Sequence, residues 1–147
     1  MRLTTKTRYA VTAVLGLALH KGKGPLTLSE LSEEQGISIS YLEQLFANLR
    51  AKGLVKGVRG PGGGYYLGRS AEDISIGDII CATDEWVAYN YSEKLPILRN
   101  NDGDTSRGLW MSLGRQLFDY VNGIKLSDIV EEQTVHSSEH GKSKIAA

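Results

Sequence analysis

Apolar residues recur at three- and four-residue steps through the first part of the chain, and this pattern predicts three helices. The expected helices span residues 7–20, 27–36 and 40–53, and a glycine lies at or just beyond the end of each. A hydroxyl residue followed three positions later by glutamate has the spacing of a capping box. Two such boxes open the second and third helices: Thr27 with Glu30, and Ser40 with Glu43.

Two short runs of β-prone residues follow, at 54–58 and 64–67, and a glycine-rich segment separates them. Such runs on either side of a glycine-rich turn are typical of a β-hairpin. A helix, a helix-turn-helix and a hairpin, in this order, form the outline of a winged helix. The sequence therefore predicts a mainly α fold with a small β-hairpin wing, and it places the winged helix-turn-helix domain at residues 1–69.

The second half of the chain contains a further helix, a loop and a long helix. Ser75 and Asp78 have capping-box spacing and open the further helix. Residues 87–104 show no clear period and include Pro96, so we expect a long loop there. A long helix is predicted for residues 105–122.

The long helix carries a broad apolar face, and the chain has little other core left to cover it. A matching helix from a second subunit would bury this face, so the sequence predicts a homodimer. The expected interface residues are Leu109, Trp110, Leu113, Leu117, Tyr120 and Val121.

A short helix is expected at residues 126–132. We interpret residues 70–133 as a unit made of the linker helix, the loop and the dimerisation helix. Residues 134–147 are polar and poor in apolar side chains, so we expect a disordered tail there.

The formal net charge of the chain is zero, but the charges divide between its two halves. Residues 1–69 hold ten Lys and Arg against four Glu, a net charge of +6, and residues 70–147 hold seven against thirteen acidic residues, a net charge of −6. This division favours a basic surface for a polyanion in the first half, although chance unevenness could also produce it. The chain has no apolar run of membrane-spanning length and no signal-peptide pattern, so we expect a cytoplasmic protein without a membrane partner.

The predicted third helix offers side chains that can read DNA. Its polar side carries hydroxyl, carboxylate and amide groups for base edges, and Arg50 lies near its end for the phosphate backbone. Glutamate can accept a hydrogen bond from cytosine, and glutamine can pair with adenine. A structural interpretation stays open for each: Glu43 could merely complete the Ser40 cap, and Gln44 and Asn48 could merely be solvated.

The tip of the predicted hairpin is the second candidate for DNA contact. Its glycines would let the backbone approach a phosphate, or let Arg59 enter a narrow minor groove. A nucleotide-binding phosphate loop is the rival interpretation, but the lysine and hydroxyl residue of a P-loop are missing. We therefore predict that the chain binds double-stranded DNA. The residues expected to contact it are Arg2, Ser38, Ser40, Tyr41, Glu43, Gln44, Asn48, Arg50, Arg59 and Gly60.

Several of these segments resemble the IscR-type family of bacterial winged-helix transcription regulators. The similarity runs from Met1 to about Asp84 and returns more weakly near residues 109–110 and 126–130. Its most specific combination is the Ser-Tyr-Leu-Glu-Gln-Leu segment of the third helix together with the Arg-Gly-Pro-Gly-Gly-Gly-Tyr segment of the wing.

The resemblance implies a homodimer whose long helices cross and which reads an imperfect palindrome near promoters. It also implies that three residues of the third helix face bases, namely Ser40, Glu43 and Gln44. By the same resemblance, Arg59 enters the minor groove.

The chain departs from this family in the loop before the long helix. IscR-type sensors bind a [2Fe–2S] cluster there through three cysteines and a histidine, whereas the loop of this chain contains neither residue type. Aligned without gaps, the ligand positions are Ser92, Leu98, Asp104 and Arg107. None of these residues supplies a thiolate, so we expect no cofactor and no iron–sulfur cluster.

Cys81 is the only cysteine, so no disulfide forms within one chain. Its apolar neighbours favour a small buried thiol, and redox sensing is the alternative. His136 and His140 have the helical spacing of metal ligands but no third partner, so we expect no metal site.

Three aromatic residues lie at the start of the expected loop: Trp86, Tyr89 and Tyr91. They could line a pocket for an unknown small-molecule effector, and packing is the interpretation we favour.

The sequence predicts a regulator rather than an enzyme. It contains no recognisable nucleophile triad, pair of catalytic carboxylates or metal constellation. A protein-interaction adaptor built on a winged helix is the remaining alternative, but an adaptor would not need a basic first half. We therefore predict a sequence-specific transcription regulator, acting as a homodimeric repressor on a pseudo-palindromic promoter site without a cluster.

Overall fold

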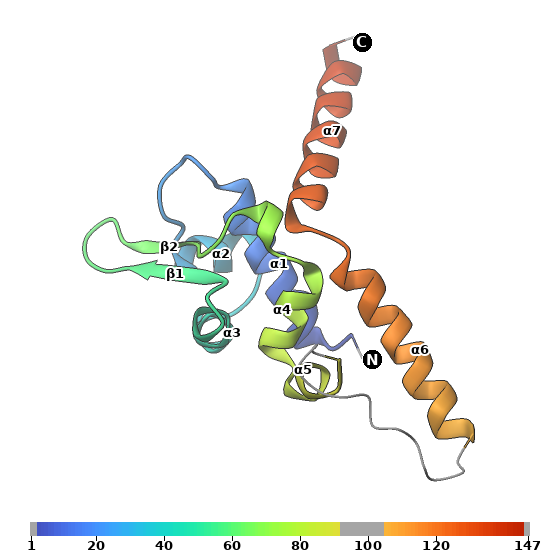
Figure 1. Ribbon diagram of the computed structural model, residues 1–147. Helices are drawn as coiled ribbons and strands as arrows, with labels where there is room; N and C mark the ends of the chain where they lie inside the picture. The colour runs from blue at the N-terminus through green and yellow to red at the C-terminus, as the bar shows by residue number, and fades with distance from the viewer. Residues whose placement is uncertain (1–2, 92–104, 146–147) are drawn as a thin grey trace.

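The computed structural model describes residues 3–91 and 105–145, and the side chains of residues 3–91 and 108–138 (Figure 1). The first half contains α1 (Thr5–Leu19), α2 (Leu28–Gln35), α3 (Ile39–Ala51) and the strands β1 (Val55–Val58) and β2 (Gly64–Leu67). The second half contains the 3-10 turn η1 (Ala71–Asp73), α4 (Ile76–Thr83), α5 (Glu85–Tyr91), α6 (Thr105–Asn122) and α7 (Leu126–Ile145). The two strands form an antiparallel hairpin, which confirms the mainly helical fold with a small wing.

The second helix is built as its sequence pattern predicts. Thr27 Oγ1 accepts a hydrogen bond from the Glu30 backbone N–H at 3.1 Å, and Glu30 Oε2 accepts one from the Thr27 backbone N–H at 2.8 Å. The bonds from the Thr27 backbone and hydroxyl lower the pKa of the Glu30 carboxyl, because they favour its charged form. Gly36 closes the helix with a left-handed φ of 67°.

The expected start of the third helix was wrong by two residues. Ser38, not Ser40, is the N-cap, and its side chain accepts a hydrogen bond from the Tyr41 backbone N–H at 3.3 Å. Ile37 and Leu42 occupy the two positions of a hydrophobic staple, and both are buried in the core. Burial of this apolar pair places the cap at Ser38 and leaves the capping-box spacing of Ser40 and Glu43 unused.

α1 lies near the centre of the molecule, with the wing and α3 on one side and α6 on the other (Figure 1). Ala10, Ala13 and Val14 of α1 are fully buried. Gly16 continues this close packing, since an added Cβ would lie 2.9 Å from Gln35 Nε2 and 3.0 Å from Leu31 Cδ2. Small residues on α1 therefore allow α2 to pack closely against it.

The segment expected to be a long loop begins with a helix. Residues 85–91 form α5, whose start is capped by Asp84 Oδ1, which accepts a hydrogen bond from the Val87 backbone N–H at 3.1 Å. Tyr91 is buried and its ring stacks on Phe118 of α6, with centroids 5.6 Å apart and planes inclined by 17°. Seven residues are too few to show a helical period, and the contact with Phe118 is long-range. The rest of the expected loop, residues 92–104, lies outside the described residues.

The C-terminal helix is longer than predicted. α6 has the expected bounds, but α7 continues to Ile145, whereas the sequence predicted a helix only to residue 132 and a disordered tail from residue 134. Hydroxyl side chains in this part bond back to carbonyls four residues earlier, for example Thr134 to Val130 at 2.9 Å and Ser138 to Thr134 at 2.9 Å. In these bonds the helix's own carbonyls accept from the hydroxyl side chains, so the polar residues find partners within α7.

The placement of the α3 cap generates a stability prediction. Ser38→Ala should lower the free energy of unfolding by about 1 kcal/mol, because the Tyr41 N–H loses its acceptor. Ser40→Ala, the same change two residues later, should leave it within about 0.5 kcal/mol, because Ser40 is exposed within the first turn. Urea unfolding without DNA measures both variants, and a larger loss at Ser40 would contradict the observed cap.

Candidate DNA-binding surface

α3 has one buried side and one exposed side. The buried residues are Leu42, Leu45, Phe46 and Leu49. Five of the sequence-predicted contact residues are exposed on this helix or at its cap: Ser38, Ser40, Glu43, Gln44 and Arg50. Asn48 is half-buried, and Arg2 lies outside the described residues. The helix therefore presents hydroxyl, carboxylate, amide and guanidinium groups on a single element, as a major-groove reader requires.

The Glu43 side chain makes no hydrogen bond or ion pair to any residue in the described part of the chain. The cap that could have occupied its carboxylate belongs to Ser38. The alternative that Glu43 serves only to complete a capping box is thereby excluded, and its carboxylate stands at the surface beside Gln44.

Tyr41 has a packing contact of its own. Its half-buried ring meets the ring of Tyr9 edge to face, with centroids 5.7 Å apart and planes at 88°. The pair ties the first turn of α3 to α1, so Tyr41 helps to hold the helix in place as well as lying near its polar side.

The wing is held against α3 and ends in a glycine turn. Tyr65 of β2 packs on Phe46 of α3 with ring centroids 4.7 Å apart, and it forms an isolated bridge to Leu26. At the tip, Gly60 has a φ of 96°, and a Cβ added to Gly63 would lie 2.4 Å from the Val58 carbonyl oxygen. Only glycine permits this turn. The turn leaves Arg59 and Gly60 exposed at the end of the hairpin.

A hollow of about 520 Å³ lies beside the wing, between the α1–α2 connection and the segment after β2. None of its lining residues is acidic, and four are basic: His20, Lys21, Lys56 and Arg69. The sequence motifs do not point to this hollow. The net charge of +6 in residues 1–69 was the signal that could have found it. The basic residues that line the hollow add positive charge next to the hairpin.

The outer face of α6, defined by Leu109, Trp110, Leu113, Leu117 and Tyr120, is exposed. These five side chains are between 41% and 71% exposed. Val121, the sixth expected interface residue, instead packs against the core of its own chain. Phe118 was not identified from the sequence, although it is the buried residue that joins α6 to α5. α6 is therefore apolar on two sides, and the described residues cover only one of them.

The described residues offer no group of three or more His, Cys, Asp and Glu side chains that could hold a metal ion. Burial, with a smaller contribution from Asp78 and Asp84, raises the pKa of the Cys81 thiol to about 11. Cys81 is half-buried on α4. Its thiol stays protonated at neutral pH, which makes it a poor nucleophile and a poor metal ligand.

The four positions aligned with cluster ligands have no described side chains. Ser92, Leu98 and Asp104 lie outside the described residues, and so does the side chain of Arg107. The absence of a cluster therefore stays a prediction.

Of the three aromatic residues before this segment, Tyr91 is buried, whereas Trp86 is 54% exposed despite its contact with Tyr91. Tyr91 is buried on Phe118, and Trp86 contacts Tyr91 edge to face at 5.7 Å between ring centroids. Tyr89 is 62% exposed. The effector pocket considered for these three residues gains no support from this arrangement, because Tyr91 is occupied by its packing partners.

The chain as a whole is similar to a known family of proteins. The Rrf2 family, described as iron-dependent transcriptional regulators, matches residues 3–132. The chain is 48% identical over 135 residues to the HTH-type transcriptional regulator IscR of Pectobacterium carotovorum, covering 92% of this chain and 82% of that protein. It is 47% identical over 135 residues to IscR of Escherichia coli, with 92% and 83% covered.

Solved structures agree with this placement. The T. potens IscR structure has a TM-score of 0.75 and 37% sequence identity, over 90% of this chain and 88% of that one. CymR, the global cysteine regulator of B. subtilis, has a TM-score of 0.73 and 31% identity, over 90% of this chain and 98% of that one. Among the described residues, no helix combines the length and the apolar character needed to cross a membrane.

Proposed function

Since this chain belongs to the Rrf2 family of transcriptional regulators, we propose that it acts as a homodimeric repressor that occupies a pseudo-palindromic promoter site without an iron–sulfur cluster. The chain is a DNA-binding regulator of the helix-turn-helix type and not an enzyme. The observation that supports promoter recognition is the exposed polar side of α3, with the glycine-tipped wing held beside it.

In the proposed complex α3 enters the major groove. Gln44 and Glu43 meet base edges, where the amide can pair with adenine and the carboxylate can accept from cytosine. Arg50 reaches the phosphate backbone, and Arg59 at the wing tip enters the adjacent minor groove. The contacts of Phe46 with Tyr65 keep the two reading elements at a constant separation.

The proposed dimer forms through the outer face of α6. Five large side chains exposed along one helix make a continuous apolar stripe, and a second copy of the same stripe would bury it. A two-fold dimer presents two copies of α3 in opposite directions, which matches a site with two inverted halves. A promoter covered in this way is closed to polymerase, and this is the basis for proposing repression.

The experiment that tests DNA recognition is selection of fragments from the organism's own genome by the purified protein. We expect a pseudo-palindrome whose half-sites lie roughly 34 Å or a multiple apart, and an affinity that falls steeply with salt. Arg59→Ala should weaken binding by about 1–3 kcal/mol, most at A/T-rich flanks. Arg115→Ala removes a guanidinium paired with Asp119 on α6 and serves as the control. Equal binding of all sequences at physiological salt would refute specific recognition.

Glu43→Ala separates base reading from structure. The carboxylate is exposed and unbonded within the described residues, so urea unfolding should be unchanged. Loss of a cytosine contact should reduce discrimination at one base position by about 1–3 kcal/mol. Removal of a negative charge should also tighten binding to sites that lack a partner for it. Glu34→Ala, an exposed glutamate on α2, is the matched control. An unaltered base preference in Glu43→Ala would remove Glu43 from the proposed interface.

DNA binding should not depend on an iron–sulfur cluster. Cluster iron requires thiolates, sometimes with imidazole, and the one thiol of each chain has a pKa of about 11. Protein purified without oxygen should be colourless, and its affinity for the selected DNA should not respond to oxygen or to a chelator. Stoichiometric iron and acid-labile sulfide, lost in Cys81→Ala, would contradict this expectation.

A further inference from the structure

The segment that joins the wing to α4 also holds the end of α6. The Ile76 backbone N–H donates to the Ile124 carbonyl at 2.9 Å, and the Leu126 N–H donates to the Ile74 carbonyl at 2.8 Å. Ser75 and Lys125 form an isolated antiparallel bridge between these two bonds. Ile74 and Leu126 are fully buried. The wing connection and the turn after α6 therefore meet as a short two-stranded contact.

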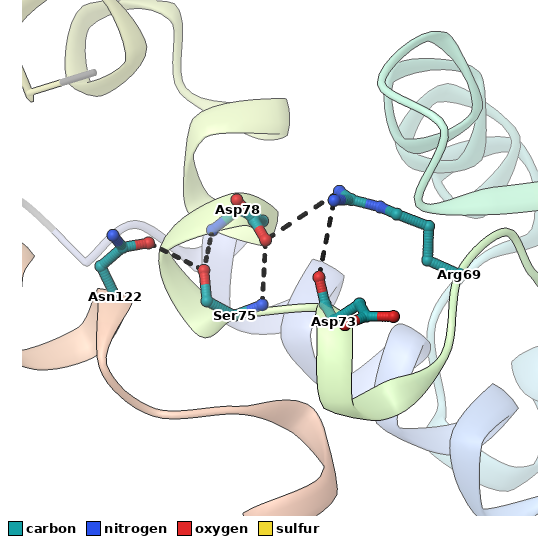
Figure 2. Close-up of polar contacts among 5 residues, drawn as sticks. All are labelled: Arg69, Asp73, Ser75, Asp78 and Asn122. Carbon is teal, nitrogen blue, oxygen red and sulfur yellow. Dashed lines mark hydrogen bonds and ion pairs between the residues drawn. The ribbon is translucent and has the colours of Figure 1, made fainter. Parts of the chain in front are cut away.

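A side-chain hydrogen bond strengthens this contact. Ser75 Oγ accepts from the Asp78 backbone N–H at 2.9 Å, so its single hydrogen is left for another acceptor. The Ser75 hydroxyl donates that hydrogen to Oδ1 of Asn122, which is the last residue of α6, at 2.8 Å (Figure 2). Ser75 is only 2% exposed, so the bond is largely shielded from competing water.

Gly77 sets how closely α4 approaches the end of α6. A Cβ added at this position would lie 2.4 Å from Asn122 Oδ1 and 2.9 Å from Asn122 Cβ. Side chains do not tolerate such separations, so any larger residue would push α6 away. Gly77 is a packing requirement here, since its backbone φ is not in the left-handed region.

The same group of residues reaches the base of the wing. Asp78 Oδ2 accepts from the Ser75 backbone N–H at 3.0 Å and lies 3.9 Å from Arg69 Nη2. Arg69 Nη1 also donates to the Asp73 carbonyl at 3.5 Å (Figure 2). Arg69 follows the last residue of β2 by two positions. A continuous set of polar contacts thus runs from the wing base to the end of the proposed dimer helix.

We infer that the Ser75–Asn122 hydrogen bond, packed against Gly77, sets the spacing between the two half-sites that the dimer accepts. The inference rests on the dimeric DNA-binding function proposed above. If the outer face of α6 pairs two copies, the angle between α6 and the winged domain fixes where each α3 lies. One added base pair moves a half-site by about 3.4 Å and turns it by about 34°. A stiff junction rejects such a shift, and a loosened junction accepts it. Asn122 and Gly77 are then positioning residues that touch no DNA.

The test uses the full-length protein and the duplex that the wild type selects. The half-sites are kept, and one or two base pairs are inserted or deleted between them; a single half-site duplex is the reference. In Asn122→Ala, the preference for the selected spacing over its neighbours should fall about fivefold, the effect of one neutral hydrogen bond. Affinity for the single half-site should not change. Asn90→Ala is the control and should retain the wild-type preference, because the Asn90 amide donates to the Trp86 carbonyl within α5 and to no other described residue.

A second pair of variants tests the packing. Gly77→Ala should reduce the spacing preference further than Asn122→Ala, because the added Cβ displaces α6. Asn122→Gly in the Gly77→Ala background removes the atoms that clash and should return the preference to the level of Asn122→Ala. Unfolding midpoints and sedimentation check whether each variant is folded and has the oligomeric state of the wild type.

Wild-type spacing preference in both Asn122→Ala and Gly77→Ala would overturn the inference. Equal weakening on every duplex, half-site included, would also overturn it, because that result indicates a general loss of structure. A wild-type protein that is monomeric, or that binds all spacings equally, would refute the proposed dimeric function itself and this inference with it. The first two results leave the proposed function standing, and the third does not.

Discussion

Burial of the apolar side of α3 is the interaction on which the proposed DNA-binding surface depends. Leu42, Phe46 and Leu49 have no exposed surface, and burying each contributes about 1.5–3 kcal/mol relative to an exposed side chain. The helix cannot rotate without exposing them. Its opposite side, with Glu43 and Gln44, is therefore forced outward. The polar groups that could read bases owe their direction to the apolar groups behind them.

The wing depends on the same burial. Phe46 belongs to the α3 stripe and also packs on Tyr65, so one residue orients the helix and anchors the hairpin. The tip needs only glycines and an exposed Arg59, because its position is set at the hairpin base. A short two-stranded hairpin is marginally stable alone, and contact with a helix supplies the missing stability.

α6 illustrates how one helix can serve two surfaces. Phe118 joins it to α5 within the chain, while the outer face carries Trp110, Leu117 and Tyr120 at more than half exposure. The inner contact fixes how the outer face is turned. This is why the junction at Asn122 is well placed to transmit the orientation of the proposed dimer helix to the winged domain.

Elements whose signals lie within a few neighbouring residues were predictable from the amino-acid sequence. The capping box of Thr27, the glycine-rich hairpin and the bounds of α6 were all predicted, and so was the regulator family, because period, cap spacing and motif are local properties. Tertiary structure decided what depends on contacts between distant residues. Burial of Ile37 moved the N-cap of α3 to Ser38 and freed Glu43 from a capping role.

The same reason accounts for the other differences. Phe118 stabilises α5 at Tyr91 from another helix, and packing on the core turns Val121 inward, away from the face predicted for it. The Ser75–Asn122 bond joins residues 47 positions apart in the chain. No periodicity or spacing rule encodes such a contact. Only the folded chain, in which burial of apolar surface brings α4 and α6 together, decides which polar atoms can meet there.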